Sequence, residues 1–337
     1  MSSCLLTYNE IDKRQWAALV KQSKTGNWFQ SSEAYDFYAS LPEMLRPFVC
    51  AVSGNGKLAA VCVGYVTQEH CRIKQFFTRR AIIVGGPCLA DDCINEDVSL
   101  LLSTLRQQLS TGANAPIYIE TRNFNDYSRW KSAFGKAGFE YMPHLNFHIH
   151  CADENEMWNR LSETRHRQIR KAIATGVRIE ETGMEQDIRD WYRILENLYR
   201  TKVKRPLFPI DFFLAFHRKG LGKYLFVKYD GRVIGGIMCP IMHGRCIYEW
   251  FVCGLDVEYK NQYPSVMATW AAMQYANGHE IPMFDIMGAG QPNVPYGVRN
   301  FKAEFGGTLV EHGRFLYVVN PLLFKIGTLG VKIQKQW

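Results

Sequence analysis

The segment that runs from Met287 to Arg299 and on to Phe301 and Lys302 has the residue types that best suggest chemistry. It contains three glycines and two prolines and shows no regular periodicity, and long irregular segments of this kind are more often functional than structural. If the FKAEF that ends it is a strand, residues 301, 303 and 305 face a core while Lys302 and Glu304 face the other way. Lys302 is then a candidate cation for negative charge that develops on a substrate oxygen. The alternative is a solvated strand face.

The aromatic segment CIYEWFVCG (246–254) is a second candidate. Its alternation would place Tyr248 and Trp250 on one face of a strand and Glu249 and Phe251 on the other. Tyr248 and Trp250 are therefore candidates for lining a substrate groove, although core packing is the simpler role for at least one of them.

A highly charged helix is expected from about Asn155 to Thr175. At helical spacing its apolar residues form one stripe, made of Trp158, Leu161, Ile169, Ala172 and Ile173. Its basic face consists of His166, Arg167, Arg170 and Lys171. Arg165 falls inside the apolar stripe, and a buried arginine needs a partner. It therefore either pairs with an internal carboxylate or points into a ligand groove.

The elements that position these residues occur twice in the sequence. Residues 48–66 predict two strands around a Gly-Asn-Gly turn, and residues 226–242 predict a second hairpin around Asp230 and Gly231. After each hairpin we expect a strand (80–89 or 246–255), a helix (about 96–109 or 264–277) and a closing strand (116–122 or 282–288). This order predicts a mixed sheet of the α/β class, with a crossover helix joining its last two, parallel, strands.

Two tandem domains follow from the repeat and from the length of 337 residues, which exceeds what one core usually holds. We expect them at residues 1–147 and 148–320, with a hinge near Pro143 to Asp153. The tail, residues 321–337, is an expected amphipathic helix. Its apolar side carries Leu322, Leu323, Ile326, Leu329, Ile333 and Trp337. It either packs back on the N-terminal domain or lies at a membrane surface.

Composition excludes several classes of protein. With 47% hydrophobic and 13% aromatic residues the chain is globular rather than disordered or fibrous. No apolar run is long enough for a membrane helix, and Glu10 and Asp12 interrupt the place of a signal peptide, so we expect a cytoplasmic protein. The ten cysteines lack the spacing of a zinc site, so no metal is expected. The net charge of +8 is either ordinary surface charge or an attraction for polyanions.

Three segments of the second half are distinctive: RHRQIRKAIATGVRIEE (165–181), FDIMGAG (284–290) and NFKAEFGGTLVEHGRFLYVVNP (300–321). With the weaker NWFQSSEAYDFY (27–38) and AIIVGGP (81–87), they resemble the FemA/FemB/FemX (FemAB-type) aminoacyltransferases that extend peptidoglycan stem peptides. The Phe-Lys and Phe-Gly-Gly motifs of the third segment are the most specific part. No sustained heptad run exists, so the chain resembles the compact type without a coiled-coil arm.

The resemblance implies two tandem GNAT (acyl-CoA N-acyltransferase)-like domains and an amide-forming acyltransferase. In the implied reaction, a primary amine of a cell-wall or other envelope precursor attacks an aminoacyl ester on tRNA. The family places a catalytically important lysine at the Phe-Lys pair, which is Lys302 here, and lines its channel with aromatic side chains such as Tyr248 and Trp250. The full set of candidate substrate-binding residues is Tyr248, Trp250, Arg165, Arg167, Arg170, Phe301 and Asp285.

The base and the donor stay open at this point. Asp285, Glu249 and His312 are all candidates for a general base, and none stands out; family members are thought to relay the proton between substrates. Acyl-CoA enzymes bind pyrophosphate through a glycine-containing loop at a helix start, whereas YKNQYPSVMATW (259–270) has neither glycine. Aminoacyl-tRNA as co-substrate is therefore favoured over acyl-CoA, with no bound cofactor.

Two other functions compete with this one. One is an acyl-CoA-dependent N-acyltransferase acting on a sugar amine in polysaccharide synthesis, which tight CoA binding would reveal. The other is a non-catalytic protein that binds a cell-wall precursor or partner. For each of these functions we expect a monomer, either free in the cytoplasm or in peripheral contact with the inner face of the membrane.

Overall fold

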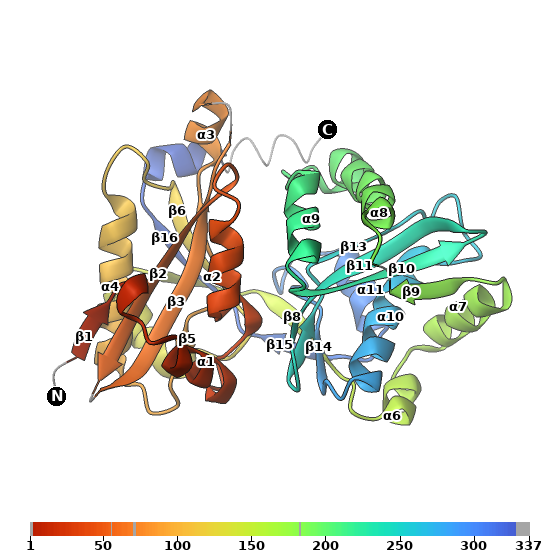
Figure 1. Ribbon diagram of the computed structural model, residues 1–337, viewed down its shortest axis with the longest axis horizontal. Coiled ribbons are helices and arrows are strands. Elements are labelled where there is room, and N and C mark those ends of the chain that lie inside the picture. Colours follow the sequence, from red (N-terminus) through yellow and green to blue (C-terminus); the bar gives the residue numbers. More distant parts are fainter. Residues whose placement is uncertain (1–2, 55, 70–71, 182, 328–337) are drawn as a thin grey trace. The chain divides into compact units, whose positions relative to one another are not determined.

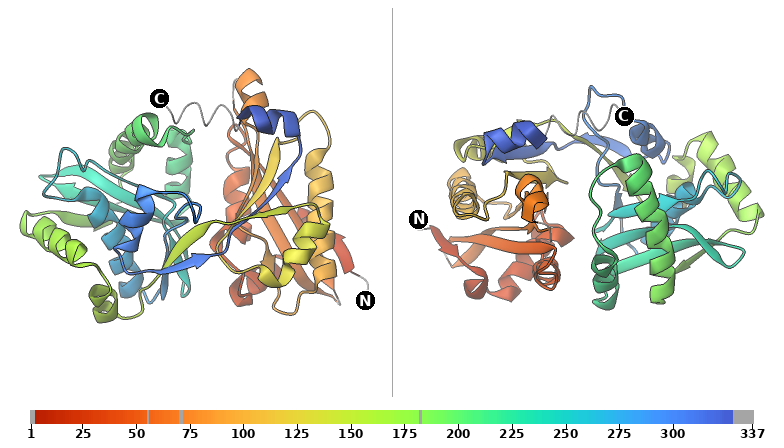
Figure 2. Two further views of the ribbon diagram at one scale, coloured as in Figure 1. Left: turned by 180° about the vertical axis from the view of Figure 1, so that it is seen from behind. Right: turned by 90° about the horizontal axis from the view of Figure 1, so that it is seen from above.

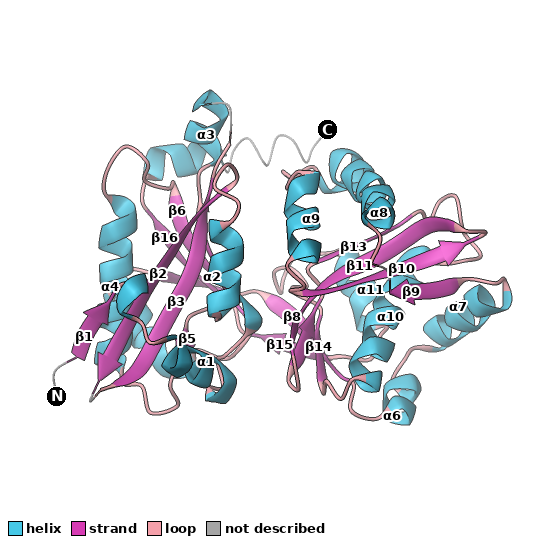
Figure 3. Ribbon diagram, viewed as in Figure 1, coloured by secondary structure: helices cyan, strands magenta, loops and turns pink. Residues whose placement is uncertain are grey.

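The computed structural model describes residues 3–54, 56–69, 72–181 and 183–327. The chain forms two compact units: unit 1 is Met1–His144 with Glu311–Trp337, and unit 2 is Leu145–Val310. Each unit is a mixed β-sheet with helices against it (Figures 1 and 3). The predicted α/β class is therefore confirmed.

The sheet of unit 1 has eight strands in the described part of the chain. The order is β1-β2-β3-β4-β6-β16-β7, and β5 pairs with β3. The paired neighbours are antiparallel, except that β4 and β6 run parallel. The strands are β1 (Ser3–Leu6), β2 (Leu45–Gly54), β3 (Lys57–Thr67), β4 (Ala81–Gly85), β5 (Cys88–Leu89), β6 (Tyr118–Asn123), β7 (Glu140–Met142) and β16 (Arg314–Val318).

Helices cover both faces of this sheet. Successive side chains of a strand point to opposite faces of the sheet. On one face, Cys62 and Ile119 join the core formed with α4 (Asn95–Ser110) and α5 (Lys131–Lys136). On the other face Tyr65 of β3 meets Tyr38 of α2, with ring centroids 4.9 Å apart. The remaining helices are α1 (Lys13–Gln22), α2 (Ser32–Ala39), α3 (Arg72–Thr78) and the short 3-10 helices η1 (Tyr8–Glu10), η2 (Trp28–Gln30) and η3 (Ser128–Trp130).

The sheet of unit 2 also has eight strands among the described residues, in the order β15-β8-β14-β12-β11-β10-β9, with β13 pairing β11. β12 and β14 run parallel. β8 is antiparallel to β14, and the pairs from β9 to β13 are antiparallel too. The strands are β8 (Leu145–His150), β9 (Arg178–Glu181), β10 (Gly222–Tyr229), β11 (Arg232–Met242), β12 (Cys246–Tyr248), β13 (Phe251–Gly254), β14 (Met283–Asp285) and β15 (Thr308–Glu311).

Helices of unit 2 also divide between the two sheet faces. Leu225 and Ile237 join the core that includes residues of α6, α7 and α10. On the opposite face Trp191 of α8 packs against Tyr224 of β10 and Phe213 of α9, with ring centroids 5.5 Å apart in both contacts. The helices are α6 (Glu154–Asn159), α7 (Glu163–Ala174), α8 (Glu185–Leu198), the π-helix η4 (Tyr199–Val203), α9 (Ile210–Arg218), α10 (Pro264–Gly278) and α11 (Gly297–Ala303).

The repeat predicted from the sequence is confirmed in both units. Hairpin β2-β3 corresponds to β10-β11, crossover helix α4 to α10, and closing strand β6 to β14. Asp230 and Gly231 have φ angles of 49° and 71°, which a two-residue turn with both central residues left-handed requires. The sequence could specify this turn because Asp and Gly tolerate that region at little cost.

Two boundary predictions are wrong, and a third, the hinge region, holds only in part. The single helix expected over 155–175 is two helices, because the Ser162 hydroxyl accepts the Arg165 N–H and starts a new one, α7. The first boundary between the units, 144/145, lies inside the expected hinge region of 143–153, although most of that region is β8, a strand of the second sheet. Residues 311–320, expected in the second domain, belong to unit 1, because β16 inserts between β6 and β7. The division therefore falls at 144/145 and 310/311.

The described start of the tail, residues 321–327, is helical and belongs to unit 1. The ring of Phe324 meets Tyr118 of β6 edge to face, 5.5 Å between centroids. Leu322 and Ile326 are 69% and 47% exposed. The other apolar positions of the expected stripe, Leu329, Ile333 and Trp337, lie outside the described residues.

Neither a spanning helix nor a metal-binding cluster occurs between residues 3 and 327, the gaps at 55, 70–71 and 182 excepted. No helix there is long and apolar enough to cross a bilayer. No group of three or more His, Cys, Asp or Glu side chains there is placed to hold a metal ion.

Candidate functional site

The candidate site of unit 2 lies where its two parallel strands part. β12 and β14 pair in register up to Tyr248 and Asp285. Beyond these residues one chain continues into β13 against β11, and the other enters the irregular segment after Asp285. The carboxyl ends of diverging parallel strands form the crevice in which α/β sheets bind ligands.

Lys302 of α11 reaches into this divergence. Its Nζ lies 2.8 Å from Glu249 Oε1 and donates to the carbonyl oxygens of Ile286 and, at 3.1 Å, Gly288. An ammonium has three donors, so these acceptors match them all. Lys302 is 8% and Glu249 6% exposed, and the pair is therefore withdrawn from water.

Burial changes the acidity of the Glu249 carboxyl group. Burial raises the pKa of Glu249 above its ordinary value, and the charge and hydrogen bond of Lys302 offset only part of that rise. Glu249 therefore takes up a proton more readily than an exposed glutamate would. Its own N–H donates to Asp285 O at 2.9 Å, so Glu249 is fixed to the end of β14 by its backbone.

The prediction that FKAEF is a strand is wrong: Phe301 and Lys302 lie in α11, which runs from Gly297 to Ala303. Phe301 and Phe305 still pack together, with centroids 5.3 Å apart. Residues four apart share a helix face, just as residues two or four apart share a strand face. The apolar spacing was therefore ambiguous, and the inferred solvated face for Lys302 does not exist.

A second cation of α11 organises the irregular segment. The Arg299 guanidinium donates to the carbonyl oxygens of Ala289 at 2.8 Å, Pro292 at 3.1 Å, and Gln291. Together with Lys302 it collects five carbonyl groups between residues 286 and 292. The segment is thus a folded loop held by two side chains, a role for Arg299 that the sequence analysis missed.

Asp285 is buried and belongs to a polar cluster. Asn146 Nδ2 donates to its Oδ1 at 2.7 Å, and Met287 N–H donates to the same oxygen at 2.7 Å. His148 Nε2 lies 3.3 Å from Asp285 Oδ2. Sequence analysis missed Asn146 and His148, although the alternation in NFHIH (146–150) puts both on one strand face. Of the three base candidates Asp285 and Glu249 meet here, whereas His312 belongs to unit 1.

Arg165 connects α7 to α11. Its Nη1 lies 3.3 Å from Glu304 Oε2, and its Nη2 donates to Phe301 O at 3.1 Å. The guanidinium also lies over the Phe301 and Phe305 rings, 4.4 and 4.9 Å from their centroids. Burial lowers the pKa of Arg165, and Glu304 opposes that shift. The buried arginine therefore pairs with an internal carboxylate, the first of the two roles expected for it.

The basic face of α7 borders an open hollow of about 420 Å³. Its lining consists of Glu163, Thr164, His166, Arg167 and Arg170. Trp158 contacts two of these lining residues. The His166 ring lies against its indole with ring centroids 4.7 Å apart, and the Arg170 guanidinium lies 5.4 Å from the centroid of the indole. Arg167 and Arg170 are exposed, as the helical projection predicts.

Tyr248 and Trp250, the two aromatic candidates, have different surroundings because the strand is interrupted between β12 and β13. Tyr248 is 3% exposed and burial raises its pKa well above the ordinary value, so it is a core residue. Trp250 is half-buried in a cluster with Phe212 and Phe216, at centroid distances of 5.2 and 5.9 Å. The expected strand alternation therefore stops at Glu249.

The N-terminus of crossover helix α10 is occupied by an acidic side chain. Asp256 accepts hydrogen bonds from the Ser265 N–H at 3.0 Å and from the Ser265 hydroxyl at 2.5 Å. A carboxylate at this end of a helix takes the place that a bound phosphate would use.

Unit 1 differs at the corresponding point. Its parallel strands stay paired to Gly85 and Asn123. The Tyr127 hydroxyl donates to Pro87 O at 2.6 Å, and a Cβ at Gly86 would come within 2.6 Å of that hydroxyl. Side chains of unit 1 itself therefore fill this place, and the charged cluster around Lys302 is a feature of unit 2.

Comparisons with known proteins agree with this fold. Residues 233–332 match the model of the FemAB family. No curated protein sequence matches the chain significantly. The solved structure of FemX matches with a TM-score of 0.70 at 14% identity, covering 97% of this chain and 99% of FemX.

Two further structures share the fold. The C-terminal domain of a putative lysylphosphatidylglycerol synthetase from Agrobacterium fabrum matches with a TM-score of 0.57 at 11% identity, covering 95% of each chain. A tandem GNAT protein from the clavulanic acid biosynthesis pathway gives 0.56 at 9% identity, covering 95% of this chain and 99% of the other. The duplicated GNAT-like fold expected from the sequence is confirmed.

Proposed function

We propose that the chain is a FemAB-type acyltransferase, a proposal supported by the family match over residues 233–332 and by the duplicated GNAT-like fold, and that it transfers an aminoacyl group from tRNA to a primary amine of a peptidoglycan precursor. The observation that carries the proposal is the position of Lys302 between the ends of β12 and β14, tied to Glu249 and to two loop carbonyls. The reactive carbonyl would lie beside this ammonium, in the crevice of unit 2.

The chemistry needs a cation at that place. The amine nitrogen attacks the ester carbonyl, a C–N bond forms, and the carbonyl oxygen becomes an oxyanion until the C–O bond to the tRNA ribose breaks. Lys302 donates to that oxyanion once the substrate displaces the Gly288 carbonyl, which at 3.1 Å is a replaceable acceptor. The proton lost by the amine ends on the ribose oxygen that leaves, and Glu249 neutralises the lysine between turnovers.

The proposed donor, aminoacyl-tRNA, is supported by charged side chains on α7 and at the start of α10. The exposed Arg167 and Arg170 beside the hollow on α7 suit the phosphates of a nucleic acid. Arg165 links that helix to Phe301, the neighbour of Lys302, so a phosphate contact on α7 is mechanically connected to the reactive centre. Asp256 at the start of α10 would repel the pyrophosphate of CoA, which favours aminoacyl-tRNA.

The proposed acceptor is supported by the family match and by the likeness to FemX. A peptidoglycan stem peptide supplies the required primary amine, and an alkyl amine with a pKa near 10 has to lose a proton before it attacks. His148 brings an imidazole to Asp285 at the end of β14 and is a candidate carrier of that proton.

The test is calorimetric titration with aminoacyl-tRNA, CoA and a UDP-muramoyl-peptide, followed by an assay for the new amide. Binding of the first and third ligands with amide formation supports the proposal. Tight binding of CoA with transfer from acyl-CoA to a sugar amine would replace it by the polysaccharide alternative. Binding of the precursor without any transfer would leave a non-catalytic binding protein.

A further inference from the structure

Two exposed phenylalanines lie at one edge of unit 1. Phe76 and Phe77 of α3 are 55% and 48% exposed, and their rings touch edge to face with centroids 5.2 Å apart. Single exposed apolar side chains are ordinary on a protein surface. Adjacent aromatic rings in water are not, and contiguous apolar surface of this kind marks an interaction site.

The C-terminal helix of residues 321–327 begins at the same edge. The Ile117 N–H donates to Arg79 O, just after α3, at 2.8 Å. Ile117 O in turn accepts from the N–H groups of Val319 and Asn320, at 2.9 and 3.0 Å. Figures 1 and 2 show the helix beside α3. Its Leu322 and Ile326 are exposed as well, so each of the two helices carries two exposed apolar side chains.

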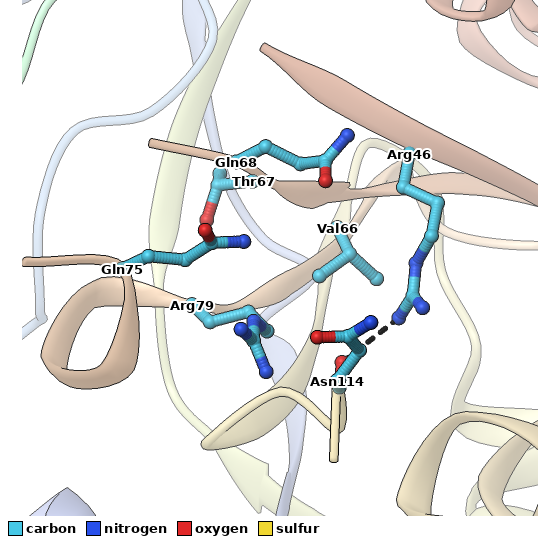
Figure 4. A pocket seen from close by; sticks show the side chains of 7 residues that line it. All are labelled: Arg46, Val66, Thr67, Gln68, Gln75, Arg79 and Asn114. Atoms are coloured by element: carbon cyan, nitrogen blue, oxygen red, sulfur yellow. Dashed lines mark hydrogen bonds between the residues drawn. The ribbon is translucent and has the colours of Figure 1, made fainter. Parts of the chain in front are cut away.

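A small polar cavity with two arginines (Figure 4) is lined in part by Gln75 and Arg79, the residues that flank Phe76, Phe77 and Thr78 in sequence. Arg46 Nη2 donates to Asn114 O at 3.0 Å and Arg79 Nη1 to Ala113 O at 2.9 Å, but neither guanidinium pairs with a carboxylate in the described part of the chain. Arg79 Nε is buried without a hydrogen-bond acceptor among those residues. Burial, and then the charge of Arg79, lower the pKa of Arg46. Within the described ranges the two guanidinium groups therefore donate to backbone carbonyls and to no carboxylate.

The size of the cavity limits the kind of anion that the two arginines could bind. Its volume is about 10 Å³, room for one water-sized group. A phosphate could place a single oxygen inside and would keep its other oxygens outside. A free phosphate would gain too little binding free energy from such a shallow contact to stay bound. A phosphate that other interactions already hold at the protein surface needs only this small additional contribution.

We propose that this edge, made of Phe76, Phe77, Leu322 and Ile326 with Arg46 and Arg79, docks unit 1 on a membrane of anionic phospholipid. The apolar side chains enter the boundary between headgroups and acyl chains. One lipid phosphate places an oxygen between the two guanidinium groups, which suit phosphate geometry. Glu43 and Glu69 are near, because the Gln68 N–H donates to Met44 O at 2.7 Å. They weaken the electrostatic attraction, so apolar insertion supplies most of the binding.

The first test measures sedimentation of the full chain with vesicles of equal parts phosphatidylglycerol and phosphatidylcholine. We expect binding, and we expect Phe76→Ser/Phe77→Ser to lower the partition coefficient by about tenfold. The matched control is Val257→Ser/Leu309→Ser, which removes two apolar side chains that are 69% and 49% exposed on unit 2. The control should bind like the unaltered protein. Equal loss in both variants would overturn the proposal.

The second test separates lipid from soluble anion. Arg46→Gln/Arg79→Gln should lose the preference for phosphatidylglycerol vesicles over pure phosphatidylcholine. Calorimetric binding of inorganic phosphate at these arginines, together with no vesicle binding, would make the cavity a soluble-anion site and end the proposal. A Phe77→Trp protein gives a result that does not depend on comparing stabilities: its fluorescence should shift to shorter wavelength on adding vesicles, and an unchanged spectrum contradicts insertion.

Discussion

Lys302 joins the ends of two strands through one side chain: Glu249, to which its Nζ lies at 2.8 Å, follows β12, and the carbonyls of Ile286 and Gly288 that it also reaches follow β14. Under the proposed function the lysine is therefore both a structural residue and the cation of the reaction. Any substitution at this position changes both the reactive group and the geometry of the crevice, and experiments have to separate the two.

Lys302→Met should lower the turnover number roughly a hundredfold or more, because a single fixed donor to an oxyanion is worth that much. It should also lower the free energy of unfolding by about 3 to 5 kcal/mol, because the buried Glu249 loses its partner. Glu249→Gln/Lys302→Met restores most of that stability without restoring turnover. Steady-state kinetics and urea unfolding measure the two effects. Recovery of turnover in the double variant would show that the lysine acts only by holding the fold.

Arg167→Gln/Arg170→Gln should flatten the dependence of tRNA binding on salt, because the log–log slope falls by roughly 0.7 to 0.9 for each phosphate that the protein no longer neutralises. The matched control is Arg189→Gln/Arg193→Gln on α8, which removes the same charge from exposed residues of the same unit. Filter-binding isotherms at several salt concentrations give the slopes. An identical slope for both double variants would assign the basic face of α7 to ordinary solvation.

Glu120 makes unit 1 sensitive to acid. Burial alone would raise its pKa, but the charges and hydrogen bonds of Arg122 and Arg314 lower it to about 2. Because the folded pKa lies below the ordinary 4.5, the stabilisation is complete above pH 4.5 and is lost as pH falls towards 2. The shift corresponds to about 3 kcal/mol.

Glu120→Gln should therefore be less stable than the unaltered protein at pH 7 and should approach its stability as pH falls through that window. Urea unfolding at a series of pH values measures the difference. A gap between the two proteins that stays constant from pH 7 to pH 3 would contradict the assignment.

Gly306→Ala should destabilise unit 2 by about 1 to 3 kcal/mol or more. Gly306 has a φ of 75°, and a Cβ there would lie 2.2 Å from the Arg160 carbonyl oxygen at the end of α6. Gly278→Ala is the matched control, because Gly278 is helical and nothing lies within 4 Å of its added Cβ. It should be neutral or slightly stabilising. Equal melting temperatures for both variants would remove the packing explanation for this glycine.

Local patterns predicted the hairpins and crossover helices well. The Asp230-Gly231 turn and the period-two strands depend on neighbours in sequence, and both appear as expected. The FKAEF segment failed because Phe301 and Phe305 are four residues apart, a spacing that fits either a strand or a helix. Lys302 was found by its family motif, whereas its partner Glu249 was only one of three base candidates. The contact between them joins elements that are distant in sequence.

The insertion of β16 between β6 and β7 determines the order in which the two units can complete folding during synthesis. Unit 2 is continuous in sequence, so residues 145–310 can fold as soon as they leave the ribosome. Unit 1 cannot complete its sheet at that stage, because β16, the strand that pairs with both β6 and β7, is formed by residues 314–318 and emerges later. Until then the nascent first unit exposes strand edges, and such edges invite pairing with other chains. The unit that carries Lys302 is thus the first to be completed, and the unit whose synthesis begins first is the last to finish folding.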